Sequence, residues 1–214
     1  MTNHKFESEF DRYIATTFPC AQLATHPIDF GDIHLRFELG GGHANGTDER
    51  IRQATDRAVD LFLARNDVDD DLVLIIKDWD SSGKEILPTE PPLYLDSMLA
   101  SFDRGLAVTE IAAVDDGSCK QMLFSTSLEN IDYRNILRGI AHLEQGREPR
   151  INASIYFVNR TRNLVFYMYD DRGCMVYAAS RATIQSLYDE RNDWLVDFHR
   201  SHFDAIFGLS LIHI

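Results

Sequence analysis

The hydrophobic and polar positions late in the chain form a clear pattern. Branched and aromatic side chains fill residues 164–169 and 174–178, and between these two runs lie the polar residues Asp170, Asp171, Arg172 and Gly173. Branched and aromatic residues favour strands, and Asp and Gly favour tight turns, including turns with positive φ. The pattern therefore predicts a β-hairpin. One explanation for this composition is that the backbone conformation of the turn requires Asp and Gly. The competing hypothesis is that these residues bind a partner or catalyse a reaction.

Earlier segments show the periods of helices and strands. Residues 5–18 repeat large apolar side chains at three-to-four spacing, which predicts an amphipathic helix. Residues 33–39 alternate strictly, as a strand with one wet face does. Thr47 is placed to cap a helix over residues 48–65. The short apolar run 72–76 predicts a strand that is covered on both faces, and we expect it to be the central strand.

The remaining pattern mixes strands and helices. Two strands joined across a polar turn at 115–118 give a second hairpin signal, and the strand before the late hairpin completes a three-stranded meander. The chain therefore has an α+β pattern, with a mixed or mainly antiparallel sheet, helices packed on it and C-terminal helices after the meander. The further predicted elements are a loop at 80–92, a short helix at 95–102, strands at 106–114, 121–127 and 152–159, and helices at 131–145 and 181–207.

Charge changes the picture of possible partners. The 214 residues hold 34 acidic and 21 basic side chains, so the formal net charge is −13. Such a chain repels phosphate backbones, and we expect no nucleic-acid binding. An acidic surface increases solubility in any protein, and it also suits a basic protein partner. No apolar run approaches the roughly 20 residues of a membrane helix, so we expect no membrane partner.

The ends of the chain and the cysteines bear on location and domain organisation. The N-terminus carries no secretory signal, so we expect a cytoplasmic protein. Cys20, Cys119 and Cys174 fit neither a disulfide framework nor a zinc site.

Residues 1–208 are expected to form a single α+β domain. Residues 209–214, Leu-Ser-Leu-Ile-His-Ile, are similar to a translation of the transposon end used in making sequencing libraries, and we expect a non-native tail.

The candidate site is the late turn. Asp170 and Asp171 are adjacent carboxylates, and in a tight turn one Asp is expected to bond its own backbone while the other faces outward. No spacing supplies further metal ligands, so we expect no metal and no cofactor. Arg172 would lie over an aromatic ring or pair with a carboxylate of another strand. We expect Tyr169, Asp170, Asp171 and Arg172 to recognise a partner.

Other motifs carry less weight. Residues 40–42 form a glycine run between a strand and a helix, but they lack the Lys and Ser or Thr of a phosphate-binding loop. Residues 78–83 are similar to the start of a calcium loop, without its closing Glu. His199 and His202 are three apart, and a solvated helix surface explains them better than a metal site. No Gly-x-Ser-x-Gly motif occurs, although catalytic groups brought together only in space stay open.

Several of these segments resemble one bacterial family. Tyr169-Asp170-Asp171-Arg172-Gly173-Cys174 is similar to its hairpin motif, and the likeness extends from about Phe30 to Phe207. The family is a bacterial domain of unknown function, number 3885, and the resemblance implies a fold without an activity, cofactor or catalytic residue. The other matching segments are Leu35-Arg36-Phe37-Glu38-Leu39-Gly40, Arg50-Ile51, Leu61-Phe62, Val158-Asn159, Leu187-Tyr188 and Trp194-Leu195.

Two function classes follow from the sequence. The first is an acidic protein-binding module for a basic protein, of the immunity or antitoxin kind, since acidic inhibitors gain association rate and specificity from charge. The alternative is an enzyme with an unrecognised active site that acts on a small molecule. The pattern does not indicate an oligomeric state.

Overall fold

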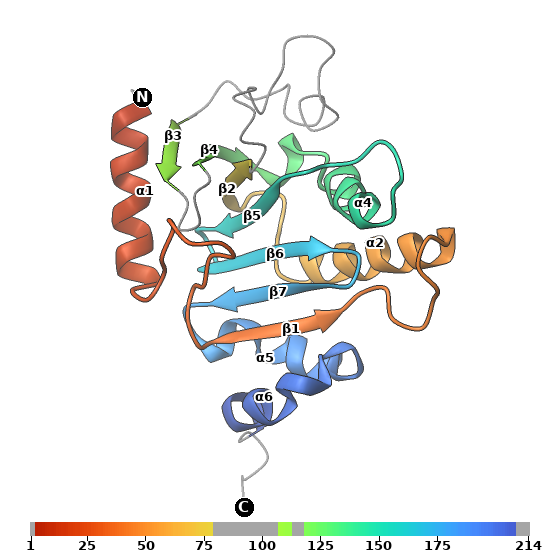
Figure 1. Cartoon of the computed structure of the whole chain (residues 1–214). Helices are drawn as coiled ribbons and strands as arrows, with labels where there is room; N and C mark the ends of the chain where they lie inside the picture. The colour runs from red at the N-terminus through yellow and green to blue at the C-terminus, as the bar shows by residue number, and fades with distance from the viewer. Residues whose placement is uncertain (1–2, 79–106, 113–117, 209–214) are drawn as a thin grey trace, which may run out of the picture.

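A seven-stranded sheet forms the centre of the computed structural model, which describes residues 3–78, 107–112 and 118–208 (Figure 1). Its order is β1-β7-β6-β5-β2-β4-β3, and every pair of neighbours is antiparallel. The predicted α+β class is confirmed. The strands are β1 (His34–Glu38), β2 (Asp71–Asp78), β3 (Ala107–Ala112), β4 (Ser118–Ser127), β5 (Ser154–Asn159), β6 (Leu164–Asp170) and β7 (Gly173–Ala178).

The order of the strands confirms the late meander and corrects one position. β5, β6 and β7 are consecutive neighbours, as predicted. β2 lies between β5 and β4 and is buried on both faces, with Leu74 toward one core cluster and Ile75 toward the other. The prediction that β2 is the central strand is wrong, because β5 holds the middle position. The predicted loop at 80–92, helix at 95–102 and tail at 209–214 lie outside the described residues.

Helices cover both faces of the sheet (Figure 1). α1 packs on one face, where Phe10 and Ile14 join the smaller core cluster. α2 and α4 cover the other face, and Ala58 and Phe62 of α2 enter the larger cluster. No helix among the described residues is long and apolar enough to cross a membrane. The helices are α1 (Asn3–Thr17), α2 (Asp48–Leu63), α4 (Tyr133–Glu144), α5 (Arg181–Glu190) and α6 (Arg200–Phe207).

Capping residues set the ends of α2 and α4. The Thr47 hydroxyl accepts a hydrogen bond from the Arg50 backbone N–H, and Asp48 lies in the first turn, where a negative charge favours the helix dipole. Asp132 caps α4 in the same way. Gly146, with φ of +64°, follows the end of α4. The helices predicted over residues 48–65 and 131–145 are therefore confirmed, with boundaries shifted by one or two residues, whereas the helical pattern predicted over 181–207 is interrupted between residues 191 and 199.

The C-terminal segment lies along the outer edge of β1. After α5 the chain forms two 3₁₀ turns, Asn192–Trp194 and Asp197–His199, and then α6. Between these turns Leu195 makes a β-bridge to Phe37, and the Val196 N–H donates to the Arg36 carbonyl oxygen at 3.0 Å. These contacts pair part of the outer edge of β1, where backbone N–H and C=O groups would otherwise lack partners in the sheet.

Candidate functional site

The turn between β6 and β7 presents one arginine. Asp170 and Gly173 pair across the hairpin, so Asp171 and Arg172 form its tip. Asp170 is buried and accepts hydrogen bonds from the Arg172 backbone N–H at 2.7 Å and from its Nε at 2.8 Å. The side chain of Arg172 is 67% exposed. Among the described residues, the ion-pair partner of Arg172 is thus Asp170 of the same turn, and not an aromatic ring or a carboxylate from another strand.

Asp171 is held inside the protein. Its side chain is fully buried and accepts a short hydrogen bond from the Nε of Arg50 on α2. The same guanidinium donates to the carbonyl oxygens of Gly40 and His43, both at 3.0 Å. The expectation that one of the two aspartates faces outward is therefore wrong. Arg50 thus joins the glycine loop to the turn, and Gly40 fits there because a Cβ at this position would lie 2.7 Å from the Asp171 carbonyl oxygen.

Gly173 and Tyr169 pack tightly beside the tip. The φ angle of Gly173 is not positive, which corrects the expected reason for a glycine there. A Cβ on Gly173 would overlap the Tyr169 hydroxyl and lie 2.6 Å from the Phe37 carbonyl oxygen. The Tyr169 hydroxyl accepts from Arg36 Nε at 3.1 Å. Burial raises the pKa of Tyr169, and Arg36 acts in the opposite direction.

The four predicted binding residues thus lie together but differ in exposure. Asp170 and Asp171 are buried, Tyr169 is half-buried, and Arg172 points into solvent. Asp170 and Asp171 hold the turn through arginine contacts. Arg172 is the member of this set that a partner could contact most fully.

Sequence reasoning missed an exposed aromatic residue in the C-terminal segment. Phe198 continues the apolar helical pattern in sequence, but 3₁₀ turns interrupt the helix and leave this residue 88% exposed. Asp197 beside it has a side chain that is 98% exposed. We use the name acidic C-terminal face for the exposed acidic residues of the C-terminal segment together with Phe198, and of these Glu190 and Asp197 lie 3.8 Å and 3.7 Å from the arginines Arg191 and Arg200: Asp189, Glu190, Asp193, Asp197, Phe198 and Asp204.

The two predicted surface histidines lie near a third one. The rings of His202 and His34 are 5.2 Å apart, and His202 Nε2 lies 3.3 Å from the Asp32 carbonyl oxygen. His202 therefore contacts the chain before β1 and keeps part of its surface exposed on α6. Within residues 3–78, 107–112 and 118–208, no three His, Cys, Asp or Glu side chains gather as metal ligands.

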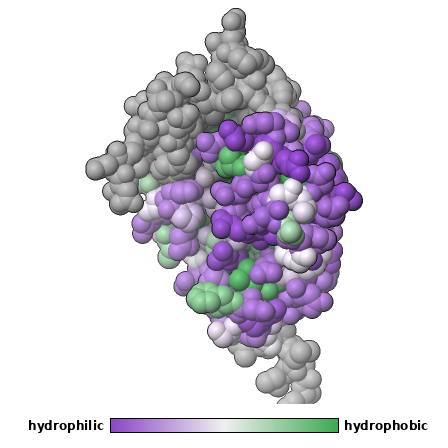
Figure 2. All heavy atoms as spheres, turned by 45° about the vertical axis from the view of Figure 1, so that its right-hand side comes forward, coloured by the Kyte–Doolittle hydropathy of each residue, from purple (hydrophilic) through white to green (hydrophobic). Residues whose placement is uncertain are grey.

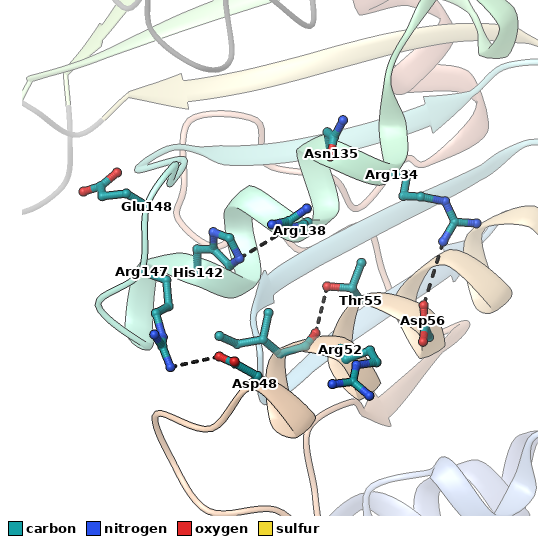
Figure 3. Close-up of a pocket in the computed structure, with 11 residues that line it drawn as sticks. Asp48, Arg52, Thr55, Asp56, Arg134, Asn135, Arg138, His142, Arg147 and Glu148 are labelled. Carbon is teal, nitrogen blue, oxygen red and sulfur yellow. Dashed lines mark hydrogen bonds and ion pairs between the residues drawn. The ribbon is translucent and has the colours of Figure 1, made fainter.

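A groove between α2 and α4 is a second feature that the sequence did not indicate (Figure 3). Its volume is about 500 Å³, and residues of both helices and of the segment after α4 line it. Figure 2 shows a largely hydrophilic face with small hydrophobic patches. The described lining residues are Asp48, Ile51, Arg52, Thr55, Asp56, Arg134, Asn135, Arg138, His142, Arg147 and Glu148.

The fold and the turn define an antiparallel α+β protein whose late hairpin is tied by buried aspartates to two arginines. The family model described as a domain of unknown function, DUF3885, matches residues 10–199, and the chain belongs to this family. A Bacillus subtilis (strain 168) relative named uncharacterized protein YnaE is 41% identical over 95 residues. That match spans 42% of this chain and 45% of the relative, so less than half of the relative's length is covered. No solved structure matches the chain.

Proposed function

We propose that the protein is a binding module for a basic protein partner, and that the acidic C-terminal face is its docking surface. The observation that carries this proposal is Phe198, 88% exposed beside the exposed carboxylate of Asp197. Large aromatic side chains serve as interface anchors, and charges around them steer the partner and select it. An aromatic anchor with a carboxylate rim suits a partner that offers an apolar pocket among Lys and Arg side chains.

The distribution of ion pairs supports a basic partner. Several arginines are paired with carboxylates of the fold: Arg50 with the buried Asp171, Arg162 with the buried Asp70, and Arg191 with the partly exposed Asp60. Each such pair uses one positive and one negative group. The excess of 13 negative charges therefore stays on the remaining acidic groups, where it attracts cationic surfaces over about one Debye length, roughly 8–10 Å in physiological salt.

Arg172 would add a contact next to this face. The Leu39 N–H at the end of β1 donates to the Arg172 carbonyl oxygen at 2.9 Å, and Leu195 bridges to Phe37 of the same strand. The turn and the C-terminal segment are thus both fixed to β1. An exposed arginine whose conformation is already set by Asp170 loses little side-chain entropy on binding.

We further propose that this binding is of the immunity or antitoxin kind and takes place in the cytoplasm. An acidic surface gains association rate against a basic toxin, which is the property an inhibitor needs. In such a system the partner would be encoded beside the gene for this chain. Co-expression should then rescue growth from the toxicity of that neighbour.

The test compares two single substitutions on exposed hydrophobic residues. The full chain is co-expressed with each basic protein encoded by a neighbouring gene, and a complex of fixed stoichiometry is isolated and its affinity measured. Phe198→Ser should weaken binding at least about 10-fold, the loss expected when an interface anchor is removed. The matched control is Val68→Ser, because Val68 is 59% exposed but lies in the segment between α2 and β2.

Equal affinities for the wild type and Phe198→Ser would contradict the docking surface. A chain that binds no basic protein and turns over a small molecule would contradict the function itself. Growth rescue without complex formation would contradict direct inhibition.

A further inference from the structure

Two arginines of the α2–α4 groove have no carboxylate partner among the described residues. The three acidic lining residues are paired with other arginines: Asp48 with Arg147 at 2.9 Å, Asp56 with Arg134 at 3.8 Å and Glu148 with Arg150 at 3.2 Å. Arg52 on α2 and Arg138 on α4 are exposed. Neither of them takes part in an ion pair within the part of the chain that the structure describes. Both guanidinium groups are therefore free to bind an anion from solution.

His142 positions Arg138. It is buried in the groove wall, and its Nδ1 lies 2.8 Å from the Pro149 carbonyl oxygen. A carbonyl oxygen only accepts, so we assign the imidazole hydrogen to Nδ1 and leave Nε2 as an acceptor. Arg138 Nε lies 3.4 Å from that Nε2 and donates to it (Figure 3). This contact uses the inner N–H of Arg138 and leaves its two terminal nitrogens for a ligand.

The composition of the groove limits the kind of ligand. Four arginines and three carboxylates line it, in a chain with a net charge of −13, so the groove is a local positive region. Its described lining holds no Phe, Tyr or Trp on which a nucleotide base could stack, and its large apolar side chain is Ile51. A compact, highly charged anion fits these walls better than an aromatic molecule does.

We propose that the α2–α4 groove binds a small anion with two phosphate groups. The guanidinium of Arg138, on one wall, takes one phosphate, and that of Arg52, on the other wall, takes the second. The planar fork of a guanidinium donates two parallel hydrogen bonds to phosphate oxygens, which makes arginine the preferred residue for such recognition. The groove volume of about 500 Å³ lies within the usual range of small-molecule sites.

The test is calorimetric titration of the full chain with inorganic pyrophosphate, at constant ionic strength. Arg52→Gln and Arg138→Gln should each weaken binding by about 10-fold or more, the loss expected for one charge-assisted contact. The matched control is Arg12→Gln, which removes one positive charge from an exposed position on α1, across the sheet from the groove (Figure 1). Arg52→Gln and Arg12→Gln should melt at the same temperature as the wild type because both side chains are exposed, whereas Arg138→Gln should melt slightly lower because the buried His142 loses its hydrogen-bond donor.

Two further ligands distinguish the chemical class. Orthophosphate should bind more weakly than pyrophosphate because it engages one guanidinium at a time, and succinate, a dicarboxylate, should bind more weakly than pyrophosphate too. The inference is overturned if the wild type binds no pyrophosphate, if succinate binds as tightly, or if Arg12→Gln weakens binding as much as the groove variants do. None of these results concerns Phe198, so they leave the basic protein partner untouched.

Discussion

Gly173→Ala should destabilise the protein strongly, and the reason is contact rather than backbone conformation. An added Cβ would lie 2.6 Å from the Phe37 carbonyl oxygen, which belongs to the neighbouring strand β1 and cannot move without disturbing the pairing of β1 with β7. It would also overlap the Tyr169 hydroxyl, which must then leave its 3.1 Å hydrogen bond from Arg36. Overpacking costs about 1–3 kcal/mol and the lost hydrogen bond about 1 kcal/mol, so we expect about 2–4 kcal/mol in all.

Urea unfolding at equilibrium measures this loss. The control is Gly208→Ala, where the new Cβ would meet its nearest neighbour, the Tyr188 hydroxyl, at an ordinary 3.6 Å and where we expect a change below about 0.5 kcal/mol. In a Tyr169→Phe background the hydroxyl is absent, so Gly173→Ala should cost about 1 kcal/mol less than in the wild type. A loss below about 1 kcal/mol for Gly173→Ala alone would refute the steric reasoning.

Three further predictions concern single groups. Arg172→Ala should weaken partner binding about 10-fold and cost less stability than Gly173→Ala, because the side chain is 67% exposed and the buried Asp170 keeps its hydrogen bond from the backbone N–H of residue 172. A stability loss equal to that of Gly173→Ala would instead show a structural pairing. For Asp70, burial tends to raise the pKa, but hydrogen bonds from the Asp67 N–H, Asn159 and Arg162 outweigh burial and lower it. The ionised Asp70 therefore stabilises the protein at neutral pH, and this contribution is lost as pH falls through the lowered folded pKa. Asp70→Asn should cost about 2–3 kcal/mol at pH 7, and below about pH 4 the stability of this variant should depend less on pH than that of the wild type. Burial lowers the pKa of His34, so protonation opposes folding, and stability should fall from pH 7 toward pH 5 less steeply in His34→Asn than in the wild type.

Local patterns were sufficient to predict most elements of the fold. The cap at Thr47, the alternation of β1 and the apolar run of β2 each reflect interactions within a few residues, and the structure has all three. The place of β2 in the sheet depends on pairing with β5, which follows it by some eighty residues, so no local pattern could fix it. A hydrophobic run shows that a strand is buried but not which strands lie beside it.

The candidate site was predicted only in part, again for physical reasons. The composition of the late turn identified Arg172, but the burial of Asp171 depends on Arg50 from a distant helix. Phe198 continues a helical period, and only the 3₁₀ turns around it expose the ring. In the sequence Arg52 looks like any other polar residue on the outer side of a helix. The groove beside it forms only when α2 and α4 pack together, so no local pattern could indicate it.

The salt dependence of partner binding tests the central claim most directly. The affinity of the isolated complex is measured at several NaCl concentrations between about 50 and 500 mM, over which the Debye length falls severalfold. Binding between the acidic C-terminal face and a basic protein should weaken at least about 10-fold over this range, mainly through the association rate. Phe198→Ser should shift the whole curve to weaker binding and leave its slope unchanged, because phenylalanine is uncharged. An affinity that does not change with salt, or a partner with an acidic surface, would contradict the account.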